Sequence, residues 1–117
     1  MGTIKIKRIY EDSSEDDGYR VLVDRLWPRG VSKEDAKIDE WNKDLAPSTN
    51  LRKWFDHKAE RFDEFSTRYR EELLMKEDEL DKLRDVARSE TITLLYGAKD
   101  PKLNQAIVLQ ELLMKGI

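Results

Sequence analysis

Three short stretches of the chain carry the hydrophobic pattern of β-strands. Residues 4–10 begin by alternating isoleucine with lysine, which is the period of a half-buried strand. Residues 20–26 contain the unbroken apolar run Val21-Leu22-Val23, so both faces of this strand should be covered, as in a parallel sheet. Residues 91–96 are β-branched and apolar, which is typical of a third strand. These stretches predict a mostly parallel sheet of about three strands.

The longest helical signal lies between the second and third predicted strands. From about residue 60 to residue 89, apolar side chains recur every three or four positions. The polar residues 76–79 divide this region into two helices, with Asp78 as the expected cap of the second. Shorter helices are expected after Ser32, after Ser48 or Thr49, and from a cap at Asp100 with Pro101 in the first helical position until Gly116.

Together these elements predict a single α/β domain covering residues 1–117. Helices pack around the small sheet, and the long helical insert joins its second and third strands. A right-handed crossover makes such an insert natural between parallel strands. One domain is also the default for a chain of 117 residues.

Composition narrows the classes of function open to this domain. The net charge is −3 with 40% charged residues, a near-balance that argues against general binding of duplex nucleic acid but leaves room for a local basic patch. There is no cysteine, which excludes disulfides, thiolate nucleophiles and cysteine-based zinc sites. We find neither the apolar core of a signal peptide nor a run of about 20 apolar residues. A cytoplasmic protein without membrane contact is expected, whereas its oligomeric state is not indicated.

Common catalytic and cofactor motifs are absent. The chain has no GxGxxG, no GxxxxGK[ST], no HExxH and no GxSxG. The single histidine, His57, lacks the partners of a metal site. We expect it at a helix end or on the surface, with a general base oriented by Asp56 as the alternative. Neither a cofactor nor a metal ion is predicted.

An acidic segment, residues 11–18, connects the first two predicted strands. It contains no apolar anchor, so a flexible surface connection is expected. A carboxylate cluster for a divalent cation is the alternative, although the spacing differs from that of a calcium-binding loop.

The candidate functional residues lie where the second and third strands end. In open α/β sheets, ligands bind at the carboxyl ends of the strands. Two strands of the same polarity should therefore bring their terminal side chains to one shared cleft. These side chains are Asp24, Arg25, Trp27 and Arg29 at the second strand, and Tyr96, Lys99 and Asn104 at the third.

The cationic residues of this set indicate an anionic ligand. Guanidinium groups and helix amino termini favour phosphate or carboxylate, so Arg25, Arg29 and Lys99 are the predicted anion-binding residues. Asn104 is expected to face the same space from the first turn of the last helix. The alternative for each arginine is a pairing with a local acid such as Asp24.

The remaining residues of the set have two interpretations each. Asp24 or Tyr96 would orient the ligand or transfer a proton, as candidate catalytic groups. Tyr96 is alternatively a partly buried ring with its hydroxyl on solvent or backbone. Trp27 could stack on a planar ligand, although a ring that covers the core beneath the turn is the more common role.

Four motifs in the chain together resemble the YeaO-like branch of domain-of-unknown-function family 488. The most specific is VDRLWPRG at residues 23–30, and the resemblance extends from residue 4 to residue 113. It implies a small cytoplasmic α/β protein without an established activity. The other three motifs are DLAPS at residues 44–48, LRKWF at residues 51–55 and TLLYGAKD at residues 93–100.

The resemblance also draws attention to Gln105. It implies a cysteine at the position of Tyr96 in the wider family, and a Cys-His-Arg run at residues 104–106. YeaO-like members commonly have Asn-His-Ala there, whereas this chain has Asn-Gln-Ala. The glutamine speaks against a histidine-dependent step at this position.

Two hypotheses about function follow. The first is a protein that binds, and as an enzyme would also transform, a small anionic molecule bearing phosphate or carboxylate. The second is a module without catalysis, which binds a nucleic-acid end or a partner protein through Trp27 and the flanking arginines.

Overall fold

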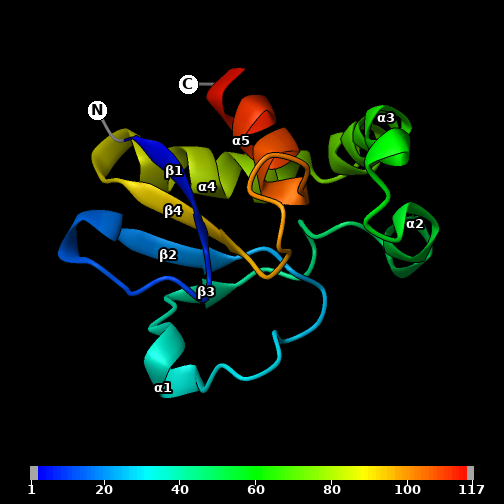
Figure 1. Cartoon of the computed structure of the whole chain (residues 1–117). Coiled ribbons are helices and arrows are strands. Elements are labelled where there is room, and N and C mark those ends of the chain that lie inside the picture. The colour runs from blue at the N-terminus through cyan, green and yellow to red at the C-terminus, as the bar shows by residue number, and fades with distance from the viewer. Residues whose placement is uncertain (1–2, 116–117) are drawn as a thin grey trace.

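The computed structural model describes residues 3–115, and its centre is a fully parallel sheet (Figure 1). Within these residues the sheet has four strands in the order β1-β4-β2-β3. The predicted parallel sheet with surrounding helices is confirmed, but the expected number of about three strands is wrong. The strands are β1 (Ile4–Arg8), β2 (Tyr19–Leu22), β3 (Glu40–Trp41) and β4 (Ile92–Tyr96).

β4 lies in the middle of the sheet, between β1 and β2. Leu94 has Ile6 opposite it on β1 and Val21 opposite it on β2. All five residues of β4 are buried, as expected for a central strand of a parallel sheet that is covered on both faces. β3 is the added strand and lies at the edge beyond β2.

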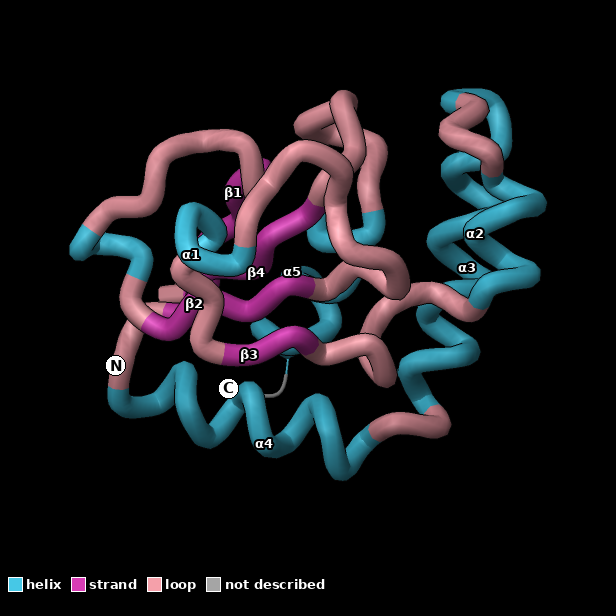
Figure 2. The backbone as a smooth tube through the Cα atoms, turned by 90° about the horizontal axis from the view of Figure 1, so that it is seen from below, coloured by secondary structure: helices cyan, strands magenta, loops and turns pink. Residues whose placement is uncertain are grey.

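The two faces of the sheet are covered unequally. The larger core joins one face to α2 (Thr49–Phe55), α3 (Phe62–Leu74), α4 (Glu77–Ser89) and α5 (Gln105–Lys115). The smaller core, on the other face, contains Leu22 and Leu95 beneath α1 (Lys33–Ala36). Figure 2 shows α1 and the long loop before it on the side of the sheet opposite α5. No helix in residues 3–115 has the length and apolar character needed to cross a bilayer.

Capping residues explain most of the helix boundaries. The hydroxyl of Ser32 accepts a hydrogen bond from the Asp35 backbone at the start of α1. That of Ser48 accepts from the Leu51 backbone at the start of α2. The expected cap at Asp78 is wrong, because α4 already begins at Glu77.

The last helix begins later than the sequence predicts. Asp100 accepts hydrogen bonds from the backbones of Lys102 and Leu103, and so closes a tight turn instead of capping a helix. α5 starts at Gln105, and the side chain of Asn104 accepts a hydrogen bond from the backbone of Ile107. Gly116, the expected end of this helix, lies outside the described residues.

The acidic segment between β1 and β2 is anchored by a buried carboxylate. Its residues 15–17 form a short 3-10 helix, η1 (Glu15–Asp17), with a capping box between Ser14 and Asp17. Asp17 is 4% exposed and accepts hydrogen bonds from Lys7 and Arg20. A second 3-10 helix, η2 (Ala59–Arg61), leads into α3. The segment therefore has a polar anchor, which a search for apolar residues does not detect.

Candidate functional site

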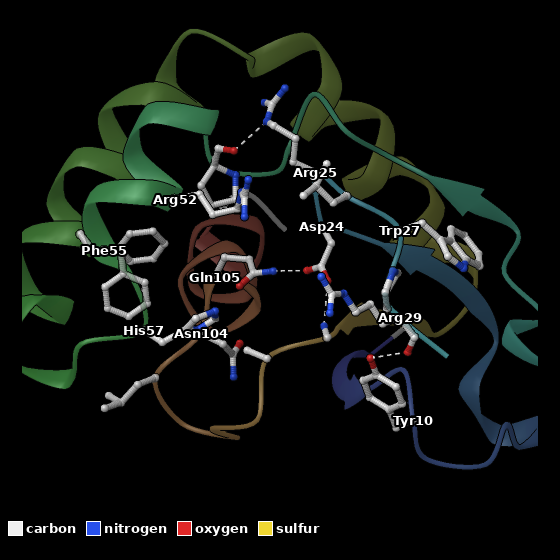
Figure 3. Close-up of a pocket in the computed structure, with 17 residues that line it drawn as sticks. Tyr10, Asp24, Arg25, Trp27, Arg29, Arg52, Phe55, His57, Asn104 and Gln105 are labelled. Carbon is white, nitrogen blue, oxygen red and sulfur yellow. Dashed lines mark hydrogen bonds between the residues drawn. The ribbon is translucent and has the colours of Figure 1, made fainter. Parts of the chain in front are cut away.

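A pocket of about 320 Å³ lies beyond the carboxyl ends of β2 and β4 (Figure 3). Its wall comes from three parts of the chain. The loop after β2 contributes residues 24–29, α2 and the turn after it contribute Arg52, Phe55 and His57, and the segment after β4 contributes Gly97, Ala98 and residues 103–105. Tyr10, Pro47 and Phe65 complete the lining.

Asp24 lies at the floor of this pocket. Its Oδ2 accepts a hydrogen bond of 2.9 Å from the backbone N–H of Gly97, and its Oδ1 accepts one from the side-chain amide of Gln105. A Cβ atom at position 97 would lie 2.9 Å from Oδ2. Glycine at position 97 therefore lets the carboxylate approach the backbone at the end of β4.

The environment of Asp24 favours its protonated form. Burial raises the pKa of this carboxyl to about 6, although the hydrogen bonds from Gly97 and Gln105 and the charge of Arg52 oppose the rise. An acid with such a pKa can exchange a proton near neutral pH.

Arg52 places a second charge in the pocket from the first turns of α2. Its Nε is buried and has no hydrogen-bond partner within residues 3–115. No described carboxylate is within ion-pairing distance of Arg52 or of Arg29. Figure 3 shows the Arg29 and Arg52 side chains directed into the space around Asp24. Two guanidinium groups therefore reach the pocket without a partner acid.

Arg25 and Trp27 also line the pocket, but most of their polar atoms contact the protein itself. The Nε of Arg25 donates to the Pro47 carbonyl at 2.9 Å, and its guanidinium is turned toward that residue (Figure 3). The indole N–H of Trp27 donates to the Val31 carbonyl at 2.7 Å. The Trp27 ring meets Trp41 edge-on, with 5.3 Å between centroids.

The structure separates the residues predicted at the end of β4. Tyr96 is 3% exposed, belongs to the larger core and does not line the pocket. Lys99 lines a neighbouring hollow of about 500 Å³, which shares His57, Gly97, Ala98 and Leu103 with the first pocket. Asn104 does reach the pocket, although its amide donates to the Asp100 carbonyl and its oxygen caps α5.

His57 lines both hollows. It is exposed and follows the end of α2, as expected for a residue at a helix end. Both Asp56 and His57 adopt left-handed backbone conformations, with φ of 48° and 54°. Such conformations cost free energy for residues other than glycine, and they occur often near functional sites.

Arg52 and Gln105 are the pocket residues that the strand-end argument misses. Arg52 lies in the LRKWF motif, but nothing in its local pattern indicates that α2 packs beside the end of the sheet. Gln105 stands out only through the family resemblance, and the structure pairs it with Asp24. Within residues 3–115, no three His, Cys, Asp or Glu side chains are grouped so that they could hold a metal ion.

The fold and the pocket define a class: small α/β proteins whose parallel sheet carries a charged pocket at the carboxyl ends of its central strands. The chain belongs to the family described as the inactive DUF488-N3 subclade, whose model matches residues 3–117. This confirms the resemblance seen in the sequence motifs.

The relatives that the chain matches are named as uncharacterized proteins. It is 46% identical over 108 residues to uncharacterized protein YeaO of Escherichia coli, covering 92% of this chain and 94% of the relative. It is 44% identical over 110 residues to uncharacterized protein Mb3100c of Mycobacterium bovis, covering 94% of this chain and 92% of the relative. No solved structure matches the chain.

Proposed function

We propose that the protein binds a small anionic molecule, bearing phosphate or carboxylate, in the pocket around Asp24. The observation that carries this proposal is the guanidinium of Arg52, which lines the pocket and has no side-chain hydrogen bond or ion pair within residues 3–115. A buried donor without an acceptor is costly, and phosphate or carboxylate matches the fork of a guanidinium. Arg29 adds a second guanidinium to the same pocket. The volume of about 320 Å³ is in the range of small-molecule sites.

Binding without turnover has more support than catalysis. The amide of Gln105 contacts Asp24, and an amide cannot transfer a proton as an imidazole does. Tyr96, the other candidate catalytic group, lies outside the pocket lining. The description of the family as an inactive subclade agrees with this choice. Of the candidates Asp24 and Tyr96, only Asp24 lines the pocket, and it would be the proton-transfer group of an enzyme.

The alternative of a module for nucleic-acid ends or protein partners has less support. It requires Trp27 to offer its ring to a base or a partner. The Trp27 indole is instead bonded to Val31 and packed against Trp41.

Thermal unfolding in inorganic phosphate tests the proposal. A ligand at 100 times its Kd stabilises a fold by about 2.7 kcal/mol, which corresponds to a Tm increase of roughly 10 °C for a domain of this size. We expect phosphate or acetate to raise Tm in a saturable way, whereas potassium chloride at equal ionic strength should not. The absence of a saturable rise with either anion would contradict the proposal.

A matched pair of variants locates the binding site. Arg52→Gln removes the guanidinium in the pocket, while Lys53→Gln removes an exposed charge from the next position of α2, outside the lining. The first variant should lose the anion-dependent rise and the second should keep it. An equal rise in both variants would place the anion elsewhere on the surface.

A further inference from the structure

The floor of the pocket presents hydrogen-bond acceptors to its interior. Each oxygen of Asp24 accepts one described hydrogen bond, from Gly97 or from Gln105. A carboxylate offers about four acceptor sites, so half of its capacity is unused. Gln105 presents its NH₂ group to Asp24, because its oxygen would be repelled by the carboxylate, and this leaves its Oε1 as a further acceptor.

Hydrogen-bond donors line other parts of the same pocket. Arg29 and Arg52 both line the pocket with guanidinium groups, which only donate hydrogen bonds. Figure 3 shows them on two sides of Asp24, with the Gln105 amide directed at the Asp24 carboxylate. The lining also includes the apolar side chains of Phe55 and Leu103. The pocket therefore combines guanidinium groups that attract anions, acceptor groups at Asp24 and Gln105, and apolar side chains.

A simple anion would complement only part of this arrangement. Its negative group would satisfy the arginines but would lie in the same small volume as the Asp24 carboxylate, and like charges repel. No Lys, Arg or His among the described residues forms an ion pair with Asp24. An ammonium group on the ligand would place a positive charge in direct contact with the Asp24 carboxylate.

Building on the proposed function, we infer that the ligand is a small zwitterion, an amino acid or an aminoalkyl phosphate. Its protonated amine lies on Asp24, and its phosphate or carboxylate lies on Arg52 and Arg29. The short carbon chain between them packs against Phe55 and Leu103. Asp24 is then a specificity-determining residue that selects the amine, whereas the arginines select the anion.

Matched pairs of probes that differ only by the amine test this inference. Calorimetric titrations of the whole chain at pH 7.5 compare 2-aminoethyl phosphate with ethyl phosphate, and β-alanine with propionate. In each pair, the compound with the amine should bind at least about tenfold tighter than the compound without it, because the amine forms a charge-assisted hydrogen bond in a partly buried site. Equal affinities within both pairs would overturn the inference.

The two proposals fail in different ways. If ethyl phosphate and 2-aminoethyl phosphate bind equally well, the anion site stands and the amine site does not. If no member of either pair binds, the anion site itself is wrong and the inference is overturned with it.

Asp24→Asn provides a second readout. Loss of the carboxylate should weaken binding of 2-aminoethyl phosphate and strengthen that of ethyl phosphate, because the negative charge beside the anion is gone. The preference within the pair should therefore disappear or reverse. A preference that persists in this variant would contradict the role of Asp24. If the variant does not fold, as circular dichroism would reveal, the comparison of probes on the unaltered chain decides.

Discussion

Asp24 combines a strand-end position with an environment that opposes its charge. It directly follows the buried Val23, and the backbone of Gly97 holds its carboxylate at the end of the neighbouring strand. Arg52 lines the same pocket but does not form an ion pair with Asp24. Asp24 is therefore a pocket acid whose pKa is raised by burial.

The pH dependence of stability should reveal the state of Asp24. Burial raises its pKa to about 6, above the ordinary value of 3.8, so the folded chain holds this proton more tightly than the unfolded chain does. The contribution of Asp24 is thus fully present below about pH 4 and is lost as pH rises through 6, by about 3 kcal/mol at most.

Two measurements check this expectation. Carbon-13 NMR titration should give a pKa near 6 for the Asp24 carboxyl. In urea unfolding, the stability difference between the unaltered chain and Asp24→Asn should shift against the unaltered chain between pH 4 and pH 6. A pKa near 4 together with a constant difference would contradict the expectation.

The sequence could predict the pocket residues that directly follow a strand. It could not predict those that reach the pocket only because of how a helix packs against the sheet. The run from Val23 to Gly30 predicted Asp24 and Arg29, and both line the pocket. Tyr96 was misplaced by one position, because the pocket begins at Gly97. β1 runs beside β4 up to Tyr96, with Arg8 opposite it, and the local sequence does not show that pairing. Arg52 depends on how α2 packs, which local patterns do not encode.

At the level of elements, the connection from β4 to α5 differs most from its expected form. Asp100 followed by Pro101 has the composition of a helix start, yet both belong to a turn. Asn104 caps α5 and at the same time donates to the Asp100 carbonyl. The turn between them forms part of the two hollows through Leu103. β3 escaped prediction for a simpler reason: two residues are too few to show a strand pattern.

Two substitutions distinguish the observed cap from the expected one. Asn104→Ala should destabilise the fold by about 0.5–2 kcal/mol, because an N-cap bond to Ile107 is lost. Asn104→Asp keeps the acceptor and should largely restore stability. Urea unfolding gives these values, and hydrogen exchange of the α5 amides shows whether the helix end frays.

Asp100→Ala is the comparison that matters here. It disrupts the turn at Lys102 and Leu103 but leaves the cap of α5 intact. Faster exchange in the first turn of α5 with Asp100→Ala, and not with Asn104→Ala, would support the sequence expectation over the structure.

Across the whole molecule, the two ends of the sheet contain different features. The pocket lies at the carboxyl ends of the strands. The opposite end contains a buried network in which Asp17 bonds Arg20 and Lys7, while the Thr93 hydroxyl donates to the Asp17 carbonyl. The Arg20 guanidinium also donates a hydrogen bond to the Ala36 carbonyl at the end of α1. This network links β1, β4 and β2 to the end of α1, the helix over the smaller core.

Loss of the Asp17 charge should destabilise the whole fold. Burial raises the pKa of this carboxyl, but hydrogen bonds from Ser14, Lys7 and Arg20 outweigh burial and lower it below 3.8. Its contribution is therefore present above about pH 4 and is lost as pH falls through the lowered pKa. At pH 7, Asp17→Asn should cost about 3–5 kcal/mol, because Arg20 stays buried without its acid.

Asp16→Asn is the matched control, since Asp16 is the exposed neighbour. It should change the free energy of unfolding by no more than about 0.5 kcal/mol. Urea unfolding at pH 7 and at pH 2.5 should show a large effect of Asp17→Asn that shrinks in acid. Equal effects of the two variants at pH 7 would show that the buried network does not stabilise the fold.

The central position of β4 also determines when the protein can acquire its shape during translation. β1 and β2 are made early, but each pairs with β4, and the two do not pair with each other. A nascent chain must carry β1 and β2 without their shared neighbour until residue 96 has left the ribosome. Contacts so distant in sequence also form slowly. The pocket, in which Asp24 bonds Gly97 and Gln105, can therefore exist only after residue 105 has been synthesised.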